Sequence, residues 1–232
     1  MSWKTAYRSL YYQDAPEPDD PDLIHRETAL LTIDIQNEYM DRPDRGSLKP
    51  DEQAEYDRWT PFHERMQGTV IPTIQRLLAA CRSSEVETMF ARIACLKPDG
   101  RDRSLSQKKP GFNYLLMPYQ ERPSQFIDAL RAEDDEIVVC KTTDSALTGT
   151  NLRLILQNMG IKNVIVTGIF TDQCISSTVR SLADESFNVI VVEDCCAAGD
   201  HALHEKELEV INMIYCHVMS CEELAGIMGL SL

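Results

Sequence analysis

Short apolar stretches alternate along the chain with segments whose apolar residues recur at helical spacing. The apolar stretches are rich in β-branched residues, which is typical of strands buried on both faces of a sheet. They predict strands at 29–34, 86–93, 136–140, 163–167, 188–192 and 216–219. Helical spacing predicts helices at 70–82, 124–132, 151–159, 175–185, 201–214 and 221–227. This alternation predicts an α/β fold with three layers, in which helices cover both faces of a parallel sheet.

Three segments fall outside this alternation. Residues 1–27 are polar and acidic with scattered aromatic residues, which predicts an extended N-terminal arm ahead of a single domain at 28–232. The arm is either disordered or packs Trp3 and its tyrosines on a partner subunit. Residues 41–61 hold Gly46 and three prolines, and predict a loop with at most one helical turn. The charged segment from Lys97 to about Met117 predicts a long functional or lid-like loop.

Composition narrows the classes of function. The 232 residues suit one large α/β domain, and a formal net charge of −14 without any basic run argues against a nucleic-acid partner. No apolar run approaches a membrane span, and the N-terminus has no secretory signal, so we expect a cytoplasmic protein without a membrane partner. A small-molecule substrate fits this composition.

The eight cysteines and five histidines do not form a recognisable metal or disulfide pattern. No C-x-x-C spacing occurs, and the histidines form no ligand-spaced cluster with the cysteines. Most of the cysteines have apolar neighbours, where small buried thiols are ordinary. We therefore expect neither a structural zinc site nor a disulfide framework.

Three chemically apt residues follow predicted strands. Asp34 closes the first strand, Lys141 follows the third, and Cys174 comes after the fourth strand and a short loop, where a helix begins. The carboxyl ends of parallel strands converge, so these side chains are expected to share one crevice. Each also has an ordinary interpretation: a helix-capping aspartate, a solvated lysine and a structural cysteine.

The position of Cys174 resembles the strand–turn–helix elbow that displays a nucleophile. The positive end of a helix dipole and unpaired backbone N–H groups favour the thiolate over the thiol and can hold an oxyanion. In this arrangement Asp34 accepts the thiol proton, Lys141 stabilises charge, and the thiolate adds to a carbonyl carbon. Thr171, inside the elbow, is expected to shape the turn and cap the helix.

Four segments carry a specific resemblance: Leu30–Tyr39 (LLTIDIQNEY), Val138–Leu147 (VVCKTTDSAL), Val166–Cys174 (VTGIFTDQC) and Val191–Ala198 (VVEDCCAA). Over roughly residues 28–225 the chain resembles the isochorismatase-like cysteine hydrolases, which include N-carbamoylsarcosine amidase, biuret hydrolase and ureidoacrylate amidohydrolase. The resemblance implies a six-stranded, mostly parallel sheet and a catalytic triad of Asp34, Lys141 and Cys174. It also implies a cis peptide bond between Ile169 and Phe170, and an oxyanion hole formed by the amides of Phe170 and Cys174.

The departures from related families narrow the expected reaction. Residues 90–103 contain no histidine, which disfavours nicotinamidase and its metal site, so we expect no metal and no cofactor. Vinyl-ether hydrolases of this fold lack the nucleophilic cysteine, so Cys174 favours covalent hydrolysis of a C–N bond in a carbamoyl, ureido or carboxamide compound. A vinyl-ether hydrolase and a non-catalytic redox or binding protein remain the alternatives. The family commonly forms homo-oligomers, and we expect a dimer or tetramer.

The residues that select the substrate are less clearly marked. Gln36 and Tyr39 follow Asp34 closely and are expected to line the pocket, and Phe170 is expected to restrict its width. Arg92, together with Lys97, Arg101 and Arg103, is a candidate for holding a substrate carboxylate, because arginine binds that group in a bidentate manner. The alternative for each of these cations is a solvated charged loop.

Overall fold

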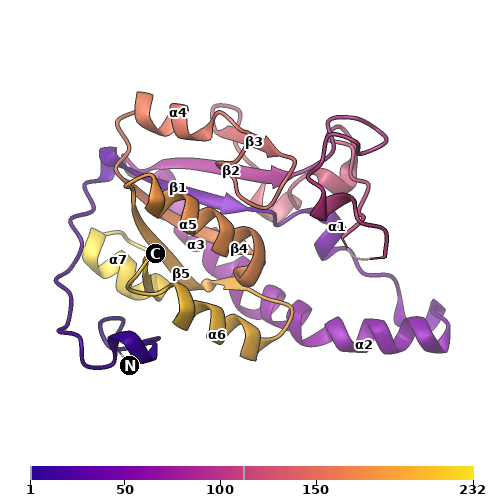
Figure 1. Ribbon diagram of the computed structural model, residues 1–232, viewed down its shortest axis with the longest axis horizontal. Coiled ribbons are helices and arrows are strands. Elements are labelled where there is room, and N and C mark those ends of the chain that lie inside the picture. The colour runs from indigo at the N-terminus through magenta and orange to yellow at the C-terminus, as the bar shows by residue number, and fades with distance from the viewer. Residues whose placement is uncertain (1, 112) are drawn as a thin grey trace.

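The computed structural model describes residues 2–111 and 113–232 and contains a single six-stranded sheet (Figure 1). In chain order the strands are β1 (Thr28–Ile33), β2 (Glu87–Ile93), β3 (Ile137–Lys141), β4 (Asn163–Ile169), β5 (Asn188–Ala197) and β6 (His217–Met219). Their order across the sheet is β3-β2-β1-β4-β5-β6, and every neighbouring pair is parallel. The predicted α/β fold is confirmed, although β5 continues to Ala197 instead of ending at Val192.

Helices cover both faces of this sheet. They are α1 (Asn37–Met40), α2 (Pro50–Arg65), α3 (Ile71–Arg82), α4 (Leu152–Asn158), α5 (Ser176–Asp184), α6 (His201–Ile211) and α7 (Cys221–Met228). Helices α3 and α7 share one apolar core with Leu30 of β1, whereas α4, α5 and α6 share the other core with Leu31. Successive side chains of a strand point to opposite faces, so each buried strand contributes to both cores.

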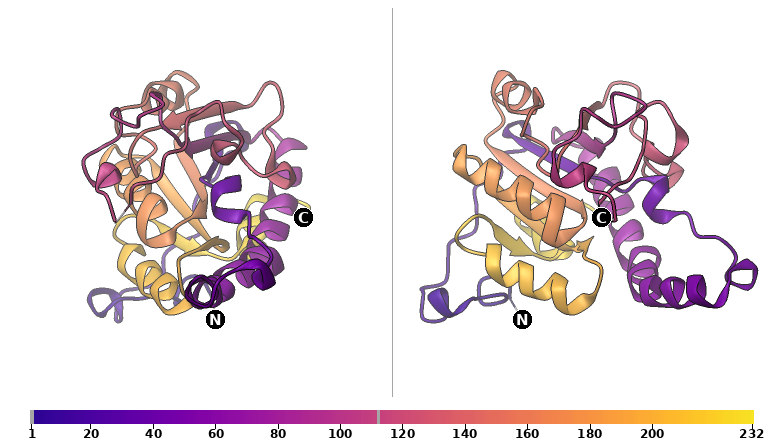
Figure 2. Two further views of the ribbon diagram at one scale, coloured as in Figure 1. Left: turned by 90° about the vertical axis from the view of Figure 1, so that its right-hand side faces the viewer. Right: turned by 45° about the vertical axis from the view of Figure 1, so that its right-hand side comes forward.

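The strand order reverses between β1 and β4. From β1 the chain passes through α2 and α3 to β2, while from β4 it passes through α5 to β5 on the opposite face. The connections of two adjacent strands therefore diverge and leave a crevice beyond their carboxyl ends, which is where open α/β sheets bind ligands. Helix α2 extends away from the sheet at this end of the molecule (Figures 1 and 2).

Strands β1 and β4 approach closely at Gly168. This residue has a φ of +123°, and a Cβ built there lies 2.0 Å from the backbone oxygen of Ile33. Beside it, the buried hydroxyls of Thr32 and Thr167 are hydrogen-bonded at 3.1 Å. Both the backbone conformation and the lack of space require glycine. The approach fixes the positions of the two loops that follow these strands.

The expectation of a loop at 41–61 is wrong, because residues 50–65 form helix α2. Pro50 occupies the first turn, where its missing N–H is not needed, and the Glu52 carboxylate accepts a hydrogen bond from the Lys49 amide at 2.8 Å. Pro61 lies inside the helix, and the next residue, Phe62, is buried in the core. Helix α2 continues through a π-helical turn at Met66–Val70 into α3.

The helix expected at 124–132 is also absent from the structure of that segment. Two single 3-10 turns, Arg122–Ser124 and Asp128–Leu130, flank an extended stretch. In that stretch Phe126 forms an antiparallel bridge with Gln36, and the Ile127 amide donates to the backbone oxygen of Ile35 at 3.2 Å. The backbone groups of this stretch form hydrogen bonds with the chain that follows β1, so they are not available for the hydrogen bonds of a helix.

The N-terminal arm packs on its own chain. The buried Trp3 stacks edge-on against His217 with ring centroids 5.3 Å apart, and its amide donates to the Glu223 carboxylate at 2.8 Å. Asn212 donates to the backbone oxygens of Ala6 and Tyr7, each at 3.1 Å. Trp3 therefore covers the β6–α7 edge of the sheet instead of standing free for a partner. The expected dimer or tetramer stays a prediction.

Within residues 2–111 and 113–232, no helix has the length and apolar character needed to cross a membrane.

Replacing Gly168 should disturb the β1–β4 contact specifically. We expect Gly168→Ala to lower the free energy of unfolding by about 2 kcal/mol or more, because the methyl group overlaps the Ile33 carbonyl. Gly226→Ala is the matched control: Gly226 lies exposed in α7, and a Cβ there meets nothing within 4 Å. It should be neutral or stabilising by up to about 1 kcal/mol. Urea denaturation measures the free energy of unfolding of both variants. An unchanged midpoint for Gly168→Ala would contradict the close approach of β1 and β4.

Candidate active site

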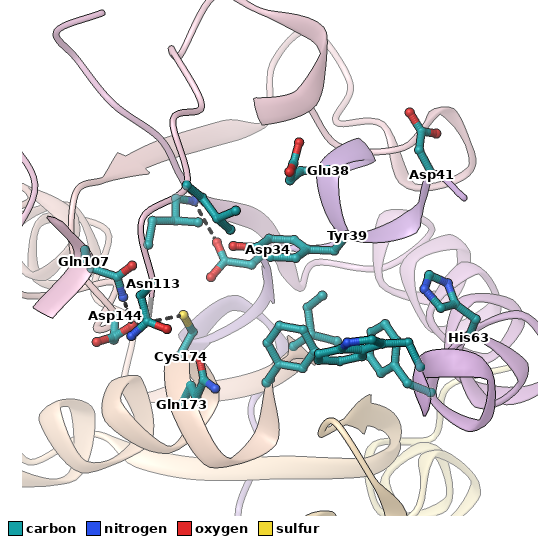
Figure 3. A pocket seen from close by; sticks show the side chains of 16 residues that line it. Asp34, Glu38, Tyr39, Asp41, His63, Gln107, Asn113, Asp144, Gln173 and Cys174 are labelled. Carbon is teal, nitrogen blue, oxygen red and sulfur yellow. Dashed lines mark hydrogen bonds between the residues drawn. The ribbon is translucent and has the colours of Figure 1, made fainter. Parts of the chain in front are cut away.

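A cavity of about 390 Å³ opens at the carboxyl end of the sheet, beside the ends of β1 and β4 (Figure 3). It is lined by Asp34, Glu38, Tyr39, Asp41, Trp59, Phe62, His63, Ile93, Gln107, Asn113, Leu115, Asp144, Ile169, Phe170, Gln173 and Cys174. Gln107, Asn113 and Asp144 gather around Cys174, whereas Asp41 and His63 lie at the opposite end of the view. The cavity therefore extends from the sulfur toward α2.

Asp34 is held rigidly where β1 ends. Its φ of +57° turns the chain out of the strand, in the left-handed region that aspartate tolerates better than most residues. Its amide donates to the backbone oxygen of Ala91 at 3.0 Å, and one carboxylate oxygen accepts the Ile93 amide at 2.7 Å. The other carboxylate oxygen, Oδ2, accepts no hydrogen bond from a described residue and forms an ion pair with Lys141.

Lys141 connects the ends of three strands. Its Nζ atom lies 2.6 Å from Asp34 Oδ2, 3.2 Å from Cys174 Sγ and 3.3 Å from the backbone oxygen of Thr143. The ammonium group donates hydrogen bonds to the sulfur and to the Thr143 oxygen, whereas its contact with Asp34 is an ion pair. The Lys141 side chain is fully buried and that of Asp34 is 2% exposed. The structure thus brings together the three residues expected to share the crevice.

Cys174 lies in a π-helical turn, Thr171–Ile175, that leads directly into α5. The turn begins right after the Ile169–Phe170 peptide bond, which is cis, as the resemblance implies. The sulfur is nearly buried and also lies 3.8 Å from Asp144 Oδ1. The role of the Phe170 and Cys174 amides as the oxyanion hole stays a prediction.

The expectation that the surroundings of Cys174 favour the thiolate is wrong for the resting protein. Burial, followed by the nearby Asp34 carboxylate, raises the pKa of Cys174 well above its ordinary value, and Lys141 offsets only part of this rise. Burial lowers the pKa of Lys141, but Asp34 and Cys174 outweigh it and raise that pKa overall. The resting site therefore holds a protonated thiol beside an ammonium group.

The turn that carries Cys174 is braced from behind by helix α6. The Thr171 hydroxyl is hydrogen-bonded to Nδ1 of the buried His204 at 2.7 Å, so it does not cap the helix as expected. The other ring nitrogen of His204 lies 3.0 Å from the Arg65 guanidinium, which also donates to the backbone oxygens of Glu193 and Cys196. Burial and Arg65 lower the pKa of His204 to about 3, so the imidazole of His204 is uncharged at neutral pH.

Two of the expected substrate residues, Tyr39 and Phe170, line the cavity, and their rings stack edge-on with centroids 5.6 Å apart. Gln36 does not line it: its amide donates to the backbone oxygens of Ile93 and Ser124 at 2.8 and 2.9 Å. Arg92 is likewise placed elsewhere, since it donates to the backbone oxygens of Tyr119 and Ser124. Both residues hold loops together, which corrects their expected role.

The other candidate cations also lie outside the cavity lining. Lys97 is exposed, and Arg101 is exposed with Asp99 as its partner at 3.7 Å. Arg103 is buried and donates to the backbone oxygen of Leu115 and to Gln107 Oε1. Gln107 in turn donates to Asp144, so a chain of hydrogen bonds links Arg103 to the cavity lining.

The sequence interpretation missed several lining residues. Asp144 lies three positions after Lys141 in a segment already singled out, and its place beyond the end of β3 was the available signal. Trp59, Phe62 and His63 come from α2; Trp59 falls where the sequence predicts a loop, and Phe62 and His63 follow directly after it. The spacing of Trp59, Phe62 and Met66 is helical and could have revealed this face. Among the described residues, no group of three histidine, cysteine or acidic side chains is arranged to hold a metal ion.

The sheet topology defines an α/β protein with the isochorismatase-like fold. The chain belongs to the isochorismatase family, whose domain model matches residues 28–223. The crystal structure of a cysteine hydrolase from Pseudomonas syringae pv. phaseolicola superposes with a TM-score of 0.73 over 91% of this chain and 97% of that chain. At 20% identity, that likeness concerns the fold alone.

Two curated relatives have named activities. Ureidoacrylate amidohydrolase RutB from Pantoea ananatis is 24% identical over 229 residues, which cover 93% of this chain and 87% of that protein. N-carbamoylsarcosine amidase from an Arthrobacter species is 30% identical over 142 residues. This second match covers 57% of this chain and only about half (53%) of that enzyme.

The cause of the raised pKa of Cys174 can be tested by alkylation. We expect Asp34→Asn to lower this pKa, because it removes a neighbouring negative charge, and Lys141→Gln to raise it. The measurement is the rate of iodoacetamide modification of Cys174 against pH, followed by peptide mass spectrometry in a Cys140→Ser background. Asp41→Asn, at the far end of the cavity, is the control and should leave the profile unchanged. An equal or higher midpoint in Asp34→Asn would contradict the electrostatic account.

Proposed function

We propose that this protein is a cysteine hydrolase that cleaves the C–N bond of a small carboxamide, carbamoyl or ureido compound through a covalent intermediate on Cys174. The observation that carries the proposal is the contact of one buried ammonium group, that of Lys141, with both the Asp34 carboxylate and the Cys174 sulfur beside a cavity. The names of the two relatives, an amidohydrolase and an amidase, support hydrolysis of a C–N bond.

In the first half of the reaction, the Asp34 carboxylate accepts the thiol proton while the sulfur attacks the carbonyl carbon of the substrate. Because burial raises the pKa of the Cys174 thiol, the proton leaves as the C–S bond forms, and no free thiolate is needed beforehand. The tetrahedral intermediate collapses when its C–N bond breaks. Asp34 returns the proton to the departing nitrogen, and ammonia or an amine leaves a thioester or thiocarbamate on Cys174.

In the second half, Asp34 accepts a proton from a water molecule, whose oxygen attacks the same carbonyl carbon. The C–S bond breaks, the proton returns to the sulfur, and a carboxylic or carbamic acid is released. The sum is one amide and one water consumed, with one acid and one amine produced. Lys141 keeps its charge throughout, because its pKa is raised, and it stabilises Asp34 and the sulfur in turn.

The negative oxygen of each tetrahedral intermediate needs donors close to the sulfur. We assign this role to the amides of Phe170, which directly precedes the π-helical turn, and of Cys174, which lies within it. Phe170 also lines the cavity, so its ring limits the group that can lie next to the carbonyl. No metal and no cofactor takes part in these steps.

Replacing the nucleophile should abolish the reaction. We expect Cys174→Ala to lower kcat/KM for a hydrolysed amide at least about 1,000-fold, since both half-reactions pass through the sulfur. The assay is ammonia release over a panel of carbamoyl amino acids, biuret, ureidoacrylate and simple carboxamides. Intact-protein mass spectrometry after rapid quenching should show the acyl or carbamoyl group on the wild type and none on Cys174→Ala.

Cys140→Ala is the matched control, because Cys140 precedes Lys141 in β3, is only half-buried, and does not line the cavity. It should keep activity within about threefold of the wild type. Full turnover by Cys174→Ala would reject covalent catalysis and favour hydrolysis of a vinyl ether. If the wild type hydrolyses nothing in the panel while Cys174 is reversibly oxidised, the redox alternative would replace the proposal.

A further inference from the structure

The cavity beside Cys174 is negatively charged. Its lining includes four carboxylate residues and one histidine, and among its described residues there is no lysine or arginine; the carboxylates are those of Asp34, Glu38, Asp41 and Asp144. Burial, followed by the charge of Arg42, lowers the pKa of His63 to about 4, so this histidine is neutral at pH 7. Nothing in the described lining therefore offers a positive charge at neutral pH.

Two of these four carboxylates are already neutralised. Asp34 pairs with Lys141 at 2.6 Å, and Asp41 pairs with Arg122 at the protein surface. The other two are not: Asp144 accepts a hydrogen bond from the uncharged Gln107 amide, and Glu38 makes no hydrogen bond or ion pair with any residue that the structure describes. Asp144 lies next to the sulfur in Figure 3, whereas Glu38 lies apart from it, above Tyr39.

One wall of the same cavity is aromatic. The Phe170 ring centroid lies 5.6 Å from that of Tyr39, 6.0 Å from that of Trp59 and 5.2 Å from that of Phe62. Such ring faces carry negative electrostatic potential and attract ammonium groups, most strongly when water is excluded. An anion placed against this wall would lose its hydration and face the Glu38 and Asp144 carboxylates without a compensating partner.

We propose that the site selects substrates in which the scissile carboxamide, carbamoyl or ureido group is joined to a protonated or quaternary ammonium group. This inference rests on the proposed function for the position of the scissile group, which lies at Cys174 and Asp144. The ammonium group lies against the aromatic wall of Tyr39, Trp59, Phe62 and Phe170, and the Glu38 carboxylate, which lies above Tyr39 in Figure 3, adds negative potential at the Tyr39 end of this wall. The substrate class differs from ureidoacrylate and N-carbamoylsarcosine, both of which carry a carboxylate.

Glu38 is the specificity-determining residue in this arrangement. It is exposed, lies in the short helix α1, and directly precedes Tyr39 of the aromatic wall. It makes no hydrogen bond or ion pair with Asp34, Lys141 or Cys174, so its charge can be changed without breaking the buried cluster. Asp144 serves the other end of the substrate, where a carboxylate oxygen suits the N–H groups of an amide or urea.

Binding of three carboxamide probes with the same three-methylene spacer tests the inference without relying on turnover. The probes are 4-aminobutanamide, pentanamide and glutaramate, which are cationic, neutral and anionic at pH 7, and their dissociation constants are measured by calorimetry on Cys174→Ala. We expect the cation to bind at least about 10-fold more tightly than pentanamide, and the anion more weakly than both. Glu38→Gln should reduce the preference for the cation about 5-fold or more, and Glu38→Lys should reverse the order of cation and anion.

Glu64→Gln is the matched control, because Glu64 is exposed on α2, does not line the cavity, and removes the same charge from the protein. It should leave the cation preference unchanged. Trp59→Leu should weaken binding of the cation more than that of pentanamide, since only the cation gains from the ring face. Glutaramate binding as tightly as 4-aminobutanamide, or an equal effect of Glu64→Gln and Glu38→Gln, would overturn the inference.

The two proposals fail in different ways. If the cation binds most tightly but the wild type hydrolyses none of the three probes and none of the amides in the panel, the proposed reaction is wrong and the ligand class stands. If the wild type hydrolyses glutaramate with a higher kcat/KM than 4-aminobutanamide, the reaction stands and the ligand class is wrong.

Discussion

The buried ion pair between Asp34 and Lys141 is the interaction on which the rest of the site depends. The pair joins the ends of β1 and β3 across β2, at 2.6 Å and with almost no exposure to solvent. Burying two charges is costly, and their other partners offset part of this cost. The Ile93 amide donates to Asp34 Oδ1, and Lys141 donates to the Thr143 carbonyl and to the Cys174 sulfur. The pair therefore requires three strand ends to be held in a fixed relation, which the parallel sheet provides.

The sheet also determines where the sulfur can lie. Strand β4 adjoins β1, and Gly168 allows the two backbones to approach before the chain turns toward Cys174. The turn is then held from the opposite side by the hydrogen bonds that link Thr171, His204 and Arg65. Arg65 ends α2, the helix that also carries Trp59 and Phe62 into the cavity. One element thus supports the nucleophile from behind and shapes the space in front of it.

The sequence predicted the sheet and the meeting of Asp34, Lys141 and Cys174 because both follow from local patterns. Buried parallel strands are continuous apolar runs, and residues just beyond them must lie at the same edge. The cavity walls were not predictable in this way, because they depend on packing between distant segments. The polar composition and prolines of α2 concealed its helical face, while Gln36 and Arg92, although close to the strand ends, turn toward loop carbonyls that only the folded chain supplies.

The negative charge of the cavity also affects the protonation of the nucleophile. Burial is the largest cause of the raised pKa of Cys174, and Asp34 and, to a smaller extent, Asp144 add to it; Asp144 belongs to the same negative surface that disfavours an anionic ligand. An anionic substrate would add to this negative potential and make loss of the thiol proton harder still. A cationic substrate of the class proposed above opposes the potential and so favours negative charge on sulfur. The ligand that binds best in such a cavity is therefore also the ligand that assists the attack.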